Sequence, residues 1–169
     1  KDFRFRGDVR AAERHLDEVL AKLKGTHGQT PILRVAYDAL DEPTRELLSR
    51  IAAFRGCVDY DAILAISDFE DDELLDTALS ELVDRGLLMW EGEGFDLHPV
   101  VRNYAYERID DPGKAHERAL CYLRSMRQPE TVTNASDIAQ VVEECHHAVG
   151  ARRHPEAIDL YRDRLAAFL

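Results

Sequence analysis

Apolar residues recur at helical spacing over most of the chain. The first such stretch follows Asp8 and runs to about Lys24, with apolar side chains every three or four positions, which predicts a helix. The segment 25–31, GTHGQTP, is rich in turn-forming residues and is typical of a linker. We therefore expect residues 1–28 to be a helical segment that precedes a separate domain.

A series of shorter helices is predicted next. The apolar pattern between 31 and 54 divides at Asp41, because Asp41 is a suitable N-cap and Pro43 suits the first turn of a new helix. Two further amphipathic stretches cover 60–66 and 72–84, each with one broad apolar face.

The period of the pattern changes after the last of these helices. The run LLMW-EGEG-FDLH, residues 87–98, is typical of two short strands around a glycine-containing turn. Pro99 then stands at the first position of a closing helix. Helices followed by a two-stranded wing and one more helix predict a mainly α fold with a winged-helix domain over 29–110.

A histidine stands where the second strand passes into the closing helix. Side chains alternate along a strand, so Phe95 and Leu97 are expected to point to one side, and Asp96 and His98 to the other. A helix start exposes unpaired N–H groups and attracts anions. His98 is therefore either one more donor to a bound anion or a plain helix cap. Arg102, one turn later, either adds positive charge to the same site or is a solvated side chain.

Residues 111–169 are predicted to be helical again. The helices are expected at about 114–127, 136–152 and 154–169. Ala148 and Gly150 in one of them, and Ala157 and Tyr161 in the next, resemble the small and aromatic positions of a tetratricopeptide-like hairpin. Such units normally stack in threes or more, so a single hairpin predicts only the start of an α-solenoid.

The charge of the chain bears on its partners. The formal net charge is −11, whereas a surface that binds duplex DNA needs clustered Lys and Arg. The stretch 59–84 holds ten Asp or Glu and no Lys or Arg, and it includes the helix that a DNA-binding winged helix would place in the major groove. We expect no nucleic-acid partner. The sequence has neither a bilayer-spanning apolar run nor a signal peptide, so we also expect a cytoplasmic protein with no membrane partner.

Several residues invite a chemical role that the spacing does not favour. Cys145, His146 and His147 are consecutive, and neighbouring helical side chains point about 100° apart, so three consecutive ligands do not converge on one ion. We expect no metal site at these residues or at His154.

Two other kinds of residue also have ordinary structural interpretations. Trp90 and Tyr106 are expected to be buried in the local core. An odd number of distant cysteines, three in all, is typical of reduced thiols.

Motifs of known catalytic chemistry are absent from the sequence. It contains no G-x-x-x-x-G-K-[ST] phosphate loop, and its Gly113–Lys114 pair has no glycine at the required upstream position. Neither a G-x-S-x-G elbow nor an H-E-x-x-H helix occurs. We expect the chain by itself to be non-catalytic.

Three strings in this order resemble one family. They are ILRVAYDALDEPTRELLSRIAAF, ALSELVDRGLL and FDLHPVVRNYAYERI, which are similar to the winged-helix subdomain that ends the nucleotide-binding core of STAND-type (NB-ARC) regulatory ATPases. In that family an L/M-H-D/P motif contains a histidine expected to contact the β-phosphate of ADP, and His98 matches it. Pro99 stands where the commoner motif has an acid, so the resemblance implies no role for that acid.

The resemblance implies a molecular switch. Residues 1–28 would end a helical subdomain, 29–110 would be the winged helix, and 111–169 would begin a helical-repeat sensor. ADP in the full-length protein would hold a closed state. A protein or peptide ligand would permit exchange for ATP and oligomerisation. His98, and with it Arg102, would face the nucleotide bound by the upstream domain in cis. The alternative is a winged-helix transcriptional regulator with a helical effector or dimerisation domain.

Overall fold

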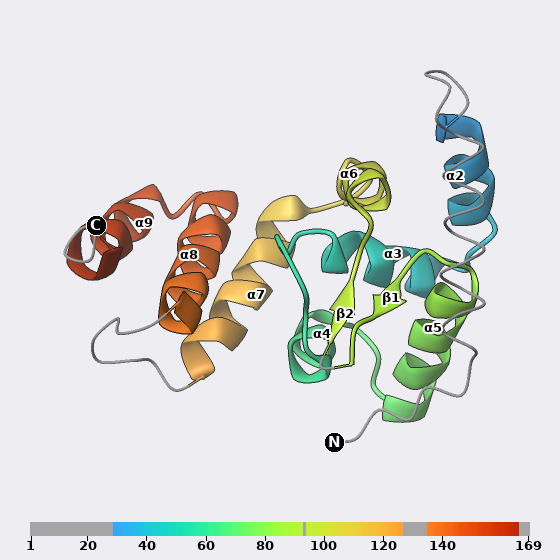
Figure 1. The fold of residues 1–169 in the computed structure, drawn as a ribbon, viewed down its shortest axis with the longest axis horizontal. Coiled ribbons are helices and arrows are strands. Elements are labelled where there is room, and N and C mark those ends of the chain that lie inside the picture. Colours follow the sequence, from blue (N-terminus) through green and yellow to red (C-terminus); the bar gives the residue numbers. More distant parts are fainter. Residues whose placement is uncertain (1–28, 93, 127–134, 166–169) are drawn as a thin grey trace. The chain divides into compact units, whose positions relative to one another are not determined.

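A computed structural model describes residues 29–92, 94–126 and 135–165 (Figure 1). Within these ranges the chain forms two compact units. The first contains residues 29–52 and 56–109, and the second contains residues 53–55 and 110–165. The helix predicted over 8–24 lies outside the described residues. The mainly helical fold class is confirmed.

The first unit has the predicted order of helices and strands. Its helices are α2 (Gln29–Asp38), α3 (Glu42–Ile51), α4 (Tyr60–Ile66), α5 (Asp72–Asp84) and α6 (Pro99–Tyr106), and its strands are β1 (Met89–Trp90) and β2 (Phe95–Asp96). Helix α2 begins inside the segment predicted to be a linker. Pro31 lies in its first turn, where a missing N–H costs no hydrogen bond.

Aspartates begin three of these helices. The Asp41 carboxylate accepts the Thr44 N–H at 2.9 Å, Asp59 caps α4 in the same way at 2.7 Å, and Asp71 caps α5 at 2.9 Å. The hydrogen bonds with Thr44 lower the pKa of Asp41. Some of the carboxylates of this unit therefore serve as acceptors for the unpaired N–H groups at helix N-termini.

The core of the first unit joins all of its helices to the wing. Its fully buried large side chains come from α3, α4, α5 and the hairpin, and they are Leu47, Leu48, Ile51, Ile63, Ile66, Leu75, Leu79, Leu82, Leu88, Phe95 and Leu97. Tyr37 ties α2 to this core, because its hydroxyl lies 2.6 Å from that of Ser49 and its ring packs edge-on against Tyr104 at 5.6 Å.

The wing is a short antiparallel hairpin of β1 and β2 (Figure 1). A further pairing, which the sequence pattern did not predict, joins β2 to the segment before α4. Val58 and Phe95 exchange two backbone hydrogen bonds, of 2.7 and 2.8 Å. Gly94 passes so close to this segment that a Cβ there would lie 2.8 Å from the Val58 carbonyl oxygen. The hairpin is thereby fixed to the helical part of the unit.

The second unit is built from consecutive helices that pack side by side (Figure 1). They are α7 (Pro112–Ser125), α8 (Ala135–Gly150) and α9 (His154–Leu160), followed by a π-helical turn η1 (Tyr161–Leu165). Leu120, Ala148 and Ala157 form a small core among the three helices. Small residues on α8 and α9 therefore allow the close approach of these helices.

The prediction that Tyr106 is buried is wrong. Tyr106 is 37% exposed, because it lies on the face of α6 opposite the buried Val101, Tyr104 and Ala105. Tyr161, the aromatic position expected in the helical hairpin, is 51% exposed. Trp90 is half-buried, and its ring packs on Phe95 with the centroids 4.7 Å apart. Among the helices in the described ranges, none combines the length and the apolar character needed to cross a membrane.

Candidate functional site

The first candidate site is the junction between β2 and α6. His98 is the N-cap of α6, and its Nδ1 accepts the backbone N–H of Val100 at 3.2 Å. A neutral imidazole that accepts at Nδ1 carries its proton on Nε2. Within the described residues no hydrogen bond is made by Nε2, and the side chain is half-exposed. His98 is thus a helix cap through one nitrogen and an available donor through the other.

The alternation predicted around His98 is confirmed. Phe95 and Leu97 are buried, whereas Asp96 and His98 are only half-buried. Pro99 stands in the first turn of α6, where its lack of an N–H removes no helical hydrogen bond. The imidazole therefore stands on the outward side of the strand, beside a helix N-terminus.

Arg102 is not a solvated side chain. It forms an ion pair with Asp96, donates to the Gly56 carbonyl oxygen at 3.3 Å, and its side chain is only 15% exposed. Its charge is therefore largely neutralised by Asp96, which weakens any attraction for a further anion at this site. Sequence spacing gave no signal for this pair, because it forms only when β2 and α6 fold back on each other.

Helices α4 and α5 are the ones that a DNA-binding winged helix would present to DNA. In this chain they present carboxylates. Glu73, Asp84 and the half-buried Asp76 lie along α5. Leu74 is 58% exposed between them. Arg85, just after α5, pairs with Glu81 one turn earlier. This face would repel nucleic-acid phosphates.

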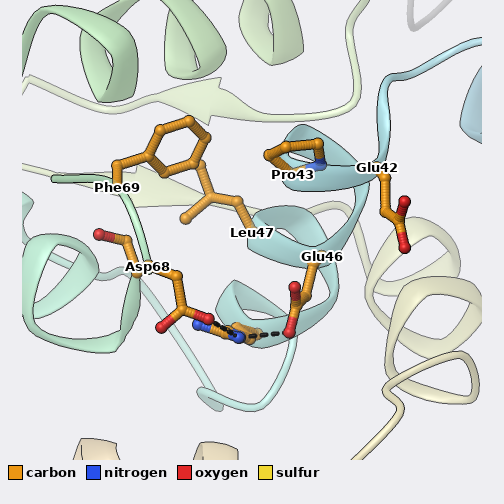
Figure 2. Close-up of a pocket in the computed structure, with 8 residues that line it drawn as sticks. Glu42, Pro43, Glu46, Leu47, Asp68 and Phe69 are labelled. Atoms are coloured by element: carbon orange, nitrogen blue, oxygen red, sulfur yellow. Dashed lines mark hydrogen bonds and ion pairs between the residues drawn. The ribbon is translucent and has the colours of Figure 1, made fainter. Parts of the chain in front are cut away.

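A pocket of about 300 Å³ lies between α3 and the segment after α4 (Figure 2). Leu47 and Phe69 form its apolar wall, and the carboxylates of Glu46 and Asp68 converge on one guanidinium. That guanidinium belongs to Arg50, which also donates to the Ile66 carbonyl oxygen at 2.8 Å.

The chemistry of this pocket excludes an anionic ligand. Arg50 already binds two carboxylates and a carbonyl oxygen, so its donors are directed at protein acceptors. Burial acts to lower the pKa of Arg50, but hydrogen bonds with Asp68 and Glu46 raise it above its ordinary value. Its role is to join α3 to the end of α4. The pocket is therefore not a candidate for the phosphates of a nucleotide.

The consecutive residues Cys145, His146 and His147 do diverge along α8. The Cys145 thiol is directed at the Ala157 carbonyl oxygen, 3.9 Å away. The two histidines, however, meet His116 from α7, a residue that the spacing in the sequence did not indicate. Burial, followed by the charges of His147 and His146, lowers the pKa of His116 to about 4. Three imidazoles are therefore gathered in the second unit.

Comparison with known proteins defines the class of the first unit. Residues 40–110 match the family model of a winged helix-turn-helix domain. Together with the observed helices and hairpin, this match shows that a winged helix-turn-helix domain is present in the chain.

The similar proteins found among curated sequences are uncharacterized. They are Mb0918 of Mycobacterium bovis and MT0918 and Rv0894 of Mycobacterium tuberculosis, each 34% identical to this chain over 108 residues. The match covers 59% of this chain and 27% of each relative, so the chain matches only about a quarter of their length. No solved structure matches the chain significantly.

Proposed function

We propose that the chain is a non-catalytic regulatory segment of a STAND-type signalling ATPase. In this proposal the winged helix helps to hold ADP and the closed state of the longer protein. The observation that carries the proposal is the half-exposed His98 at a strand-to-helix junction, with Nδ1 engaged by the Val100 N–H. The same histidine matches the family motif at FDLH.

The chemistry of His98 suits contact with a phosphate. A neutral imidazole with its proton on Nε2 donates one hydrogen bond outward, and the N-terminus of α6 adds a positive partial charge beside it. The cap fixes the ring through Nδ1, so the outward donor is held in place before the nucleotide binds. Arg102 is assigned a supporting role, because its ion pair with Asp96 and its bond to Gly56 hold β2 and α6 together.

The partners follow from the same proposal. The winged helix would pack on an upstream nucleotide-binding domain in cis, and that domain would supply the phosphate loop and the catalytic groups. Helices α7, α8 and α9 would begin a repeat sensor for a protein or peptide ligand. ATP exchange would then permit oligomerisation, in the cytoplasm and without a nucleic-acid partner.

ADP affinity of the full-length protein tests the role of His98. The informative substitution is His98→Asn, because Asn is a good N-cap and keeps an acceptor for the Val100 N–H. Loss of one hydrogen bond to a charged phosphate costs about 1.5 to 3 kcal/mol. We therefore expect ADP to bind roughly 10- to 150-fold more weakly to His98→Asn, as measured by isothermal titration calorimetry.

The helix cap supplies the control. His98→Ala removes both the cap and the outward donor, so it is expected to lose ADP affinity and also about 1 kcal/mol of stability. Wild-type ADP affinity in a folded His98→Asn protein would show that His98 is a structural cap only, and the proposed contact with ADP would then be wrong.

A further inference from the structure

We propose that His116, His146 and His147 form a binding site for a divalent transition-metal ion such as Zn²⁺. The three side chains come from two helices of the second unit, α7 and α8. One ring nitrogen from each lies within 4.8 Å of the others. His116 and His147 are 1% and 0% exposed, and His146 is half-buried. The proposal for this site does not rest on the proposed function of His98.

The spacing of the rings fits coordination of one ion. The ring centroids of the three pairs are 5.0, 5.1 and 5.1 Å apart. Zinc takes imidazole nitrogens at 2.0–2.1 Å in tetrahedral geometry, which places the centroids of two ligating rings about 5.2 Å apart. The Nδ1 atoms of His116 and His147 lie 2.8 Å apart, and two nitrogens on one tetrahedral ion are about 3.3 Å apart. A shift of about half an ångström between α7 and α8 would therefore suffice.

The outer nitrogens of two rings lie near the kinds of group that metal-bound histidines use as partners. His146 Nε2 lies 2.9 Å from the Ala53 carbonyl oxygen. His147 Nε2 lies 3.4 Å from Glu143 Oε1. Metal-ligating histidines usually donate their second N–H to a carbonyl or a carboxylate, and this fixes the other nitrogen as the ligand. Both rings are thus held with Nδ1 as the remaining donor atom for an ion.

One of these outer contacts falls short of a hydrogen bond. His147 Nε2 is fully buried and has no hydrogen-bond partner among the described residues, although the Glu143 carboxylate is near. Buried polar atoms normally have such a partner. Glu143 Oε1 is itself held in place by the Arg55 backbone N–H at 3.0 Å. A small rotation of His147 toward an ion would close its contact with Glu143.

The packing around His116 leaves its ring little freedom. A Cβ at Gly150 would lie 2.3 Å from ring atoms of His116, so the glycine at the end of α8 is what admits the imidazole. Three histidines leave the fourth tetrahedral position open to a water molecule or to another ligand. The side chain of Glu143, next to His147, is 20% exposed.

The test measures Zn²⁺ binding to the 169-residue chain free of any affinity tag. We expect one equivalent of Zn²⁺ in competition with a chromophoric chelator, and a rise in the melting temperature when Zn²⁺ is added. Co²⁺ added in place of Zn²⁺ should give the intense visible absorption of a tetrahedral site. Absence of stoichiometric Zn²⁺ binding by the folded wild-type chain would overturn the proposal.

Substitutions then locate the ion. His146→Ala, at a half-buried position, should abolish stoichiometric binding, and His147→Ala should do the same where circular dichroism shows that it folds. Glu143→Gln removes the charge beside His147 but keeps an acceptor for the Arg55 N–H, and it should weaken Zn²⁺ binding about 10- to 100-fold. His154→Ala is the matched control, because His154 is exposed and outside the cluster. Unchanged binding in a folded His146→Ala chain, or an equal loss in His154→Ala, would contradict the site.

Discussion

At the scale of single residues, the acidic side chains of the winged helix have local structural roles. Asp41, Asp59 and Asp71 each accept a backbone N–H at the start of a helix. The Asp41 cap was predictable, because Asp followed by a residue and then Pro is a common helix start. The ion pair of Arg102 with Asp96 was not predictable, because it depends on how β2 folds against α6.

The Asp41 cap gives a prediction for stability. Asp41→Ala should lower the free energy of unfolding of the first unit by about 1 kcal/mol, whereas Asp41→Asn, which keeps a carbonyl acceptor, should lower it by less. Urea denaturation followed by the fluorescence of Trp90, the single tryptophan, reports on this unit. Equal stability of the wild type and Asp41→Ala at pH 7 would contradict the role of the cap.

The same cap should respond to pH in a defined direction. The pKa of Asp41 is lowered in the folded state by its hydrogen bonds with Thr44, from an ordinary value of 3.8. A carboxyl group of this kind stabilises the fold above its unfolded pKa, and the contribution is lost as the pH falls through the folded pKa. The difference in stability between wild type and Asp41→Ala should therefore be smaller near pH 3 than at pH 7.

At the scale of elements, the apolar pattern predicted each helix of the first unit and the wing. It could not predict the pairing of Val58 with Phe95, because two residues carry too little pattern to indicate a strand. The histidine cluster was missed for a similar reason, since His116 and His147 are 31 positions apart and only the packing of α7 on α8 joins them. Cys145, His146 and His147 lie on a single helix, and their spacing carries no sign of a ligand from another helix.

The pairing of Val58 with Phe95 makes Gly94 a sensitive position. Gly94→Ala would place a Cβ 2.8 Å from the Val58 carbonyl oxygen, and the backbone would have to move. We expect a loss of about 1–3 kcal/mol in unfolding free energy. Gly56→Ala is the matched control, because a Cβ there meets no atom within 4 Å. A similar, small effect of both substitutions would show that the hairpin is not fixed at this point.

The charge of α4 and α5 predicts that the winged helix does not bind duplex DNA. No Lys or Arg lies between Asp59 and Asp84, and Arg85 pairs with Glu81. Phosphate contacts require positive side chains, so fluorescence anisotropy at physiological salt should show no saturable binding. Micromolar affinity that falls steeply as salt is added would instead favour a winged-helix transcriptional regulator.

At the scale of the whole molecule, the chain divides into two compact units with separate chemistry. The first carries the half-exposed His98, and the second carries the histidine cluster of α7 and α8. The uncharacterized mycobacterial relatives are about four times longer than the segment they share with this chain. The switch that we propose therefore has to be measured in a protein that also contains the proposed nucleotide-binding domain.

The assembly state of the full-length protein with ADP bound tests the central claim most directly. A ligand shifts an equilibrium only through its different affinity for the two states. If ADP holds the closed state through His98, the wild type with ADP should sediment as a monomer. His98→Asn at the same saturating ADP should then shift toward the oligomers proposed for the ATP-bound state. Identical sedimentation of the two proteins with ADP would contradict the account.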